Sequence, residues 1–194
     1  MRNIRAAHYT TFETAAGTCA VAWNENGISC FQLGTSRPDD IRTWHKRRVP
    51  DAVETTPDGE IAEAIAGAVR YFSGEPTDFK QTRVDLGGQT EFFKEIYTAL
   101  RRVPYGTTTT YGELAKSVGA GIERSREVGV AMATNPVPLI VPCHRVLAAG
   151  RRLSGFSAPG GVEAKAWMLK LEGTAIEPLR QQNAASRLQE SFAF

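Results

Sequence analysis

The chain has 194 residues, of which 42% are hydrophobic and 23% are charged, and its 23 basic and 21 acidic residues leave a formal net charge of +2. This composition excludes a disordered chain and a strongly basic DNA-coating protein, and the length accommodates one or two domains. Residues 1–10 lack the apolar run of a signal peptide, and no uncharged stretch reaches the roughly 20 residues that span a bilayer. We therefore expect a cytoplasmic protein that does not contact membranes.

The first third of the chain predicts a small sheet. Residues 9–12, 18–23 and 28–33 are short β-prone runs. The last two runs are joined by an Asn-Gly pair at 26–27, which tolerates the positive φ of a hairpin turn. The following segment is rich in Pro, Asp, Arg and Thr, and we expect one short helix within it, at 39–46.

A longer helix is predicted at 59–72, where apolar side chains recur at helical spacing and Gly74 and Pro76 end the pattern. The apolar positions are Ile61, Ile65, Ala68, Val69 and Phe72. The strands and helices together predict an α/β domain at residues 1–85.

The second part of the chain predicts helices at 91–100, 111–118, 124–133 and 162–171. Thr90 is the expected N-cap of the first helix. The overall fold class is therefore α+β, with a helical domain at 86–175 and a tail at 176–194.

The two middle helices surround a glycine-containing turn at 119–123, and Thr110 with Glu113 forms a predicted capping box at their start. This arrangement is typical of a helix-turn-helix, although helical hairpins also occur in cores that bind no nucleic acid. Charge supports the nucleic-acid interpretation modestly. Residues 1–90 carry ten basic and twelve acidic side chains, whereas 91–173 carry eleven and seven, so the second part suits a polyanion better.

The three cysteines are Cys19, Cys30 and Cys143. An odd number at wide spacing does not make a secreted disulfide framework, and it indicates a reducing compartment. Cys19 and Cys30 lie on predicted strands, and neither they nor His8 and His45 have the spacing of metal ligands. We therefore expect no metal and no cofactor.

Cys143 lies in the segment 135–147, which reads NPVPLIVPCHRVL. Its prolines exclude an ordinary helix, so we expect residues 137–141 to form a buried, extended run that ends at the cysteine. A buried, inert thiol is one interpretation. The other is a nucleophile activated by His144 or Arg145, since a thiol needs a base or a positive field to ionise at neutral pH.

The string PCHRV at 142–146 resembles the active-site signature of the O6-alkylguanine-DNA alkyltransferases, also called methylated-DNA–protein-cysteine methyltransferases. The resemblance extends from about residue 90 to 173, and before residue 90 only the order of strands and helix is similar. The matching residues, in family order, are Phe92, Pro104 to Gly106, Tyr111, Arg126 to Gly129, Asn135, Pro136, the PCHRV string, Gly155 to Gly161, Glu172 and Gly173.

The resemblance implies a ribonuclease-H-like first domain and a second domain that repairs DNA by transferring an alkyl group irreversibly from O6-alkylguanine, and less readily from O4-alkylthymine, to Cys143. It implies that His144 takes the thiol proton through a water and that Glu172 orients His144. Tyr111 matches the tyrosine that hydrogen-bonds the flipped base and supplies a proton. Asn135 matches the asparagine that supports the cysteine turn.

Four further residues match the family's base pocket. The carbonyls of Cys143 and Val146 would accept from the guanine amine, and the backbone N–H of Ser157 would approach O6. Met132 would form an apolar wall, and Phe156 stands where many members have Tyr. The loop at 155–161 is also longer than the common form.

On the predicted second helix of the helix-turn-helix, Arg126 matches the arginine that fills the gap left by the flipped nucleotide in the minor groove. The small residues Gly129 and Ala131 suit close approach to DNA, and Arg124 is a candidate phosphate contact. Glu127 departs from the family, which commonly has Ala there, and a carboxylate near phosphates predicts weaker DNA binding.

The implied partner is double-stranded DNA containing O6-alkylguanine, bound by a monomer. One alternative is a non-catalytic sensor of alkylated DNA, whose members replace the cysteine, so Cys143 argues against it. A Cys-His hydrolase would need an oxyanion hole and an acyl pocket, and a plain DNA-binding regulator would not need the PCHR string.

Overall fold

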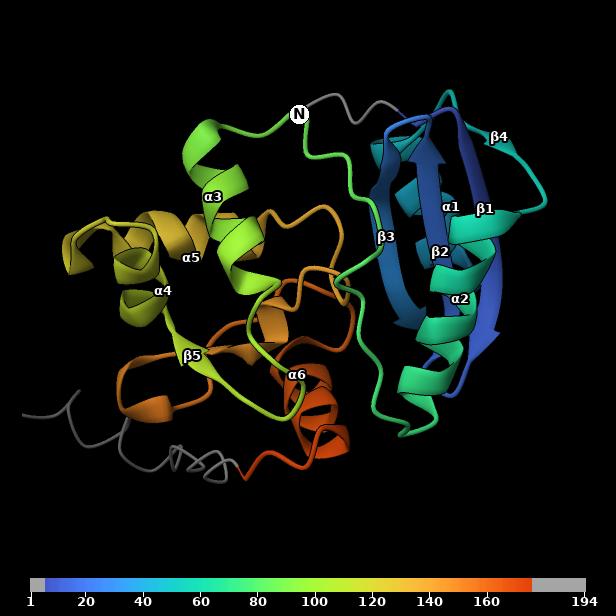
Figure 1. The fold of residues 1–194 in the computed structure, drawn as a ribbon. Helices are drawn as coiled ribbons and strands as arrows, with labels where there is room; N and C mark the ends of the chain where they lie inside the picture. Colours follow the sequence, from blue (N-terminus) through green and yellow to red (C-terminus); the bar gives the residue numbers. More distant parts are fainter. Residues whose placement is uncertain (1–5, 176–194) are drawn as a thin grey trace, which may run out of the picture.

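The computed structural model describes residues 6–175, so the predicted tail at 176–194 lies outside the described residues. A sheet-containing half and a helical half pack side by side (Figure 1). This arrangement confirms the predicted α+β class. No helix within residues 6–175 is both long enough and apolar enough to cross a membrane.

The sheet of the first half has four strands in the order β3-β2-β1-β4. The antiparallel strands β1 (His8–Thr14), β2 (Gly17–Asn24) and β3 (Gly27–Thr35) confirm the three predicted runs, and the short β4 (Val53–Glu54) pairs in parallel with β1. Gly27 closes the predicted hairpin with φ of +125°, and a Cβ there would lie 2.5 Å from the carbonyl oxygen of Arg83. Only glycine fits this turn.

Two helices cover opposite faces of the sheet (Figure 1). Because side chains alternate along β2, Ala20 and Ala22 pack with Trp44 of α1 (Pro38–Arg48), whereas Cys19 and Val21 join the core beside α2 (Gly59–Phe72). The structure extends the short helix expected at 39–46, and it confirms the bounds of the second.

The helical half consists of α3 (Glu91–Leu100), α4 (Tyr111–Ser117), α5 (Ser125–Ala133) and α6 (Gly161–Leu171), with 3₁₀ turns η1 (Ile122–Arg124), η2 (Cys143–Arg145) and η3 (Ala149–Arg151). The side chain of Thr90 caps α3, and Thr110 with Glu113 forms the predicted capping box. A two-stranded parallel sheet of β5 (Thr109–Thr110) and β6 (Val146–Leu147) was not predicted. Arg124 belongs to η1 and not to the following helix.

The prediction for residues 137–141 is correct about their burial and wrong about their extended conformation. All five residues are buried, but the chain makes a tight turn in which Leu139 has φ of +78° and the N–H of Val141 donates to the carbonyl of Val137 at 2.9 Å. Proline excludes a long helix, but a single turn needs few backbone donors, so the prolines permit it.

One hydrophobic core runs through both halves. It contains Phe31 and Tyr71 from the sheet-containing half together with Met132 and Cys143 from the helical half. The N–H of Phe31 also donates to the carbonyl of Pro136 at 2.8 Å, which ties β3 to the segment that leads to the cysteine. The sheet therefore supports the functional site directly.

Candidate active site

Cys143 begins η2 and is 5% exposed. The turn before it is closed by the side chain of Asn135, whose Oδ1 accepts from the N–H of Val137 at 3.0 Å and whose Nδ2 donates to the carbonyl of Val141 at 2.8 Å. Asn135 therefore bonds both ends of the turn, as its expected supporting role requires.

The carboxylate of Glu172, just beyond α6, is buried and accepts hydrogen bonds from four residues. Its Oε1 lies 2.7 Å from Nε2 of His144, and it accepts from the Tyr71 hydroxyl at 2.9 Å. Its Oε2 accepts from Nε of Arg145 at 2.9 Å and from the N–H of Gly106 at 3.0 Å. Although burial alone would raise the pKa of Glu172, the bonds from His144 and Arg145 lower it to about 2.

These contacts define the tautomer of His144. Because Glu172 is ionised, the nitrogen that faces it, Nε2, must carry the proton and donate. The other ring nitrogen, Nδ1, is buried and has no hydrogen-bond partner among the described residues. Burial lowers the pKa of His144, against the opposing effect of Glu172, so the ring is a neutral base with a free lone pair on Nδ1.

Burial raises the pKa of the Cys143 thiol, while the contact with Asn135 and the charge of Lys165 act in the opposite direction. A thiol in this environment stays protonated until a base removes its proton. The adjacent residue, His144, holds a buried ring nitrogen, Nδ1, that has no partner among the described residues.

A second polar chain reaches Tyr111 and was not anticipated. The ammonium of Lys165 on α6 is buried and donates to the carbonyl of Val146 at 2.5 Å and to the hydroxyl of Ser154 at 3.3 Å. Ser154 in turn lies 2.8 Å from the Tyr111 hydroxyl. Burial lowers the pKa of Lys165 to about 8, so this lysine releases a proton more readily than an exposed one.

The expected pocket residues fall into two groups. Met132 and Val146 are buried, and the Val146 carbonyl already accepts from Lys165, so only its second lone pair is open to a base. Phe156 is partly buried against the shared core, whereas Ser157 is exposed and its hydroxyl donates to the carbonyl of Ala133 at 2.9 Å. This bond fastens the loop at 155–161 to α5.

The expected DNA face, which consists of α5 and of Arg124 just before it, agrees with the structure at two positions and differs from it at two. Arg126 is exposed and forms no ion pair with any described residue, and a Cβ at Gly129 would meet open space. Ala131, by contrast, is fully buried, so the expectation that it approaches DNA is wrong. Its side chain lies on the core side of α5, because three positions beyond Val128 return to the same helix face.

The second difference concerns Arg124. Its guanidinium lies 3.5 Å from the centre of the Phe92 ring and pairs with the carboxylate of Glu127. Glu127 therefore offsets the charge of Arg124, and the expected phosphate contact would have to compete with this pair.

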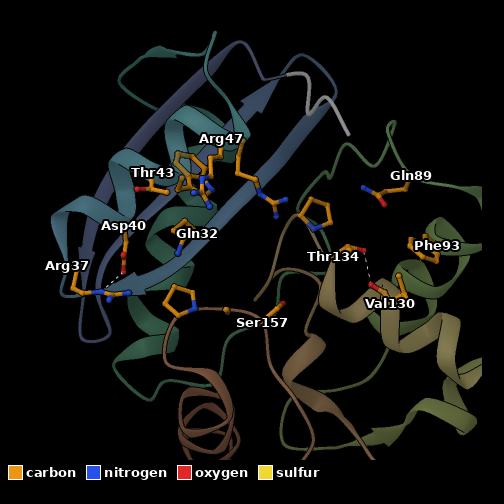
Figure 2. Close-up of a pocket in the computed structure, with 15 residues that line it drawn as sticks. Gln32, Arg37, Asp40, Thr43, Arg47, Gln89, Phe93, Val130, Thr134 and Ser157 are labelled. Atoms are coloured by element: carbon orange, nitrogen blue, oxygen red, sulfur yellow. Dashed lines mark hydrogen bonds and ion pairs between the residues drawn. The ribbon is translucent and has the colours of Figure 1, made fainter. Parts of the chain in front are cut away.

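A groove of about 760 Å³ separates α1 from α5 and the loop at 155–161. Figure 2 shows Arg37 and Arg47 on one side of it and Val130 and Thr134 on the other. Arg48 also lines the groove, and neither Arg47 nor Arg48 forms an ion pair with residues 6–175. The sheet-containing half, which is acidic by count, therefore presents basic side chains toward the predicted DNA face.

A buried cysteine with a histidine–carboxylate pair, set beneath a helix-turn-helix with an exposed arginine, defines a DNA-binding protein with a nucleophilic thiol. Residues 7–86 match the family described as 6-O-methylguanine DNA methyltransferase, ribonuclease-like domain, and residues 91–174 match its DNA-binding domain. The chain belongs to the methylated-DNA–protein-cysteine methyltransferase family.

Individual relatives agree with this assignment. The methylated-DNA–protein-cysteine methyltransferase of Methanosarcina acetivorans is 37% identical over 86% of this chain and 99% of its own length, and that of Mycobacterium tuberculosis is 34% identical over 85% and 92%. The crystal structure of the Mycobacterium tuberculosis O6-methylguanine methyltransferase is similar with a TM-score of 0.69 and 31% identity, over 89% of this chain and 96% of that one. Its complex with DNA gives a TM-score of 0.68 and 32% identity, over 86% and 92%.

Proposed function

We propose that this protein repairs duplex DNA in a single turnover by moving the alkyl group of O6-alkylguanine to Cys143. The observation that carries the proposal is the unpartnered Nδ1 of His144, a buried base beside the cysteine whose opposite nitrogen is held by Glu172. Membership of the family, and the DNA complex of a similar protein, support DNA as the partner.

In the proposed reaction, Nδ1 of His144 takes the thiol proton of Cys143 through a water. The thiolate attacks the alkyl carbon, a carbon–sulfur bond forms, and the carbon–oxygen bond breaks with its electron pair left on guanine. Tyr111 gives a proton to the leaving base and is supplied again through Ser154 from Lys165. His144 is then left protonated and Lys165 neutral, until His144 releases a proton to solvent and Lys165 takes one up. The net change is one proton moved from the thiol to guanine, and the thioether remains on the protein.

The reacting carbon is inaccessible inside a duplex, so the nucleotide must leave the stack at a cost of a few kcal/mol. Arg126 is exposed at the start of α5, where it can occupy the vacated space, and Gly129 leaves room for the backbone of DNA. The carbonyls of Cys143 and Val146 and the N–H of Ser157 would then hold the base. We propose that a cytoplasmic monomer carries out these steps.

The test is incubation with a duplex that carries one O6-methylguanine, followed by mass spectrometry of the intact protein. We expect the mass to rise by one methyl group, located on Cys143, and we expect no gain in Cys143→Ser. Binding of the alkylated duplex without any gain in mass would contradict transfer and favour the sensor interpretation.

A further inference from the structure

Tyr71 belongs to α2, in the sheet-containing half, yet it reaches the catalytic residues of the other half. It is fully buried, and its ring meets those of Tyr105 and His144 with centroids 6.1 Å away in each case. Its hydroxyl lies 2.9 Å from Oε1 of Glu172 and 3.3 Å from Nε2 of His144. The proposed proton transfers among Cys143, His144 and Tyr111 do not require this side chain.

The direction of these contacts follows from proton counting. Nε2 of His144 carries a proton, so it cannot accept one from the tyrosine, and the hydroxyl proton must point to Oε1 of Glu172. The oxygen lone pairs of Tyr71 then face Nε2. Burial, and next the charge of Glu172, raise the pKa of Tyr71 far above its usual value, so the hydroxyl remains a donor at every working pH.

We propose that Tyr71 is a positioning residue for alkyl transfer: its hydroxyl holds Oε1 of Glu172 against His144, so that the ribonuclease-like domain completes the base that activates Cys143. The proposal rests on the proposed function, because it assigns Tyr71 a part in the same proton transfer.

The physical effect is on the imidazolium that forms when His144 takes the thiol proton. That cation is stabilised by Glu172 and by the oxygen of Tyr71, while Arg145 and Lys165 oppose it. Tyr105 is the remaining titratable side chain beside Tyr71, and its hydroxyl donates to the carbonyl of Leu171. Without the Tyr71 hydroxyl, Oε1 keeps its bonds from His144 and from Nη2 of Arg145, which donates at 3.0 Å, but it loses one donor, and the positive ring loses a facing lone pair.

The test compares Tyr71→Phe with the wild type for transfer from free O6-benzylguanine, which bypasses DNA binding, across a pH series. We expect about a tenfold slower transfer near neutral pH, the size typical of one lost hydrogen bond to a charged group. The deficit should shrink toward alkaline pH, because hydroxide then replaces His144 as the proton acceptor.

Tyr97→Phe is the matched control. Tyr97 is also fully buried, and its hydroxyl donates to the carbonyl of Ala131 at 2.7 Å, away from the carboxylate. Tyr97→Phe should lower the thermal stability about as much as Tyr71→Phe does, but it should cause no pH-dependent change in the rate of alkyl transfer. A deficit in Tyr71→Phe that is equal at every pH, or that Tyr97→Phe reproduces, would show a purely structural role and overturn the proposal.

A second measurement does not depend on activity. The Nε2–H proton of His144, bonded to a carboxylate, should give a low-field NMR resonance that moves in Tyr71→Phe and stays in place in Tyr97→Phe. An unmoved resonance in Tyr71→Phe contradicts the positioning role even if transfer is slow. A wild type that transfers nothing from either DNA or the free base refutes the proposed function, and the resonance still decides the role of Tyr71.

Discussion

At the residue scale, the carboxylate of Glu172 organises the site. It joins His144, Arg145, Tyr71 and the backbone of Gly106, and these groups come from three separate segments of the chain. A carboxylate with this number of donors is held in one orientation, and it also neutralises the buried guanidinium of Arg145. Stability and, in the proposed mechanism, catalysis therefore depend on the same side chain.

Replacing Glu172 with Gln should slow alkyl transfer by about a hundredfold or more, because His144 loses the group that stabilises its cation. It should also destabilise the fold in a pH-dependent way. The pKa of Glu172 falls from 4.5 to about 2 on folding. The carboxylate therefore adds about 3 kcal/mol above roughly pH 4.5, and this contribution disappears as the pH falls through about 2.

Urea unfolding of the wild type and of Glu172→Gln, at neutral pH and at successively lower pH, measures this effect. The difference in unfolding free energy between the two proteins should shrink on acidification. A difference that is constant with pH would contradict the low pKa of Glu172.

The sequence identifies the residues of the site unevenly, for physical reasons. Cys143 and His144 are adjacent and share a recognisable string, and Glu172 follows from the same resemblance. Tyr71 lies 73 positions before His144, and a tyrosine on a helix is indistinguishable from ordinary core by its spacing. Lys165 would be assigned to the exposed face of its helix, because the carbonyl of Val146 that receives it is placed by tertiary packing alone.

At the element scale, the ion pair between Arg124 and Glu127 changes which charges near α5 are free to interact with DNA. Glu127 is exposed on the expected DNA face, but its carboxylate is engaged with Arg124, one turn earlier on the same side. The sequence correctly indicates a short helix with an exposed arginine, and the i,i+3 spacing of Arg124 and Glu127 permits their pairing. The burial of Ala131 depends on the tertiary packing of α5 and does not follow from the residue order.

Replacing Glu127 with Ala should tighten binding to duplex DNA, most clearly at low salt, because it removes a negative charge and releases Arg124 to meet a phosphate. One added phosphate contact would steepen the dependence of log K on log salt by about 0.9. Titrations at several salt concentrations measure this slope.

Glu123→Ala is the matched control, since Glu123 is an exposed carboxylate in the preceding turn and forms no ion pair with the described residues. An equal change in both variants would attribute the effect to net charge alone. Weaker binding by Glu127→Ala would contradict the release of Arg124.

At the scale of the whole molecule, the two halves share one core and several direct contacts. Besides the bond from Tyr71 to Glu172, the rings of Phe72 and Trp167 stack with centroids 5.9 Å apart and planes 4° from parallel. The sequence predicts two domains in the correct order, and the bounds at 85 and 175 stay predictions. It does not predict this interface, because the periodicity of 59–72 suggests one buried face with Val69 on it. The structure exposes Val69 and buries Tyr71, because α2 packs on two partners.

The groove between the halves predicts a contribution of α1 to DNA binding. Replacing both Arg47 and Arg48 with Gln should weaken duplex binding and reduce the salt slope by about 1 to 2, since each lost phosphate contact removes about 0.9. Transfer from free O6-benzylguanine should not change, because these residues lie outside the catalytic site.

The control is the double replacement of Arg42 and Lys46 with Gln, which removes the same charge from the same helix without touching the groove. Equal weakening in both double variants would show a long-range effect of charge. Unchanged binding in the groove variant would exclude contact between this groove and DNA.

The hydrogen bond from Tyr71 to Glu172 also determines what happens when the two halves part. In the proposed mechanism, any opening that draws α2 away from α6 withdraws one donor from the carboxylate that faces His144, while His144, Arg145 and Glu172 stay together in the helical half. Exposure of the core is then accompanied by slower transfer. A partly opened molecule, whose cysteine is accessible to other electrophiles, would carry a less activated thiol, and the single reaction available to each molecule would be favoured in the intact fold.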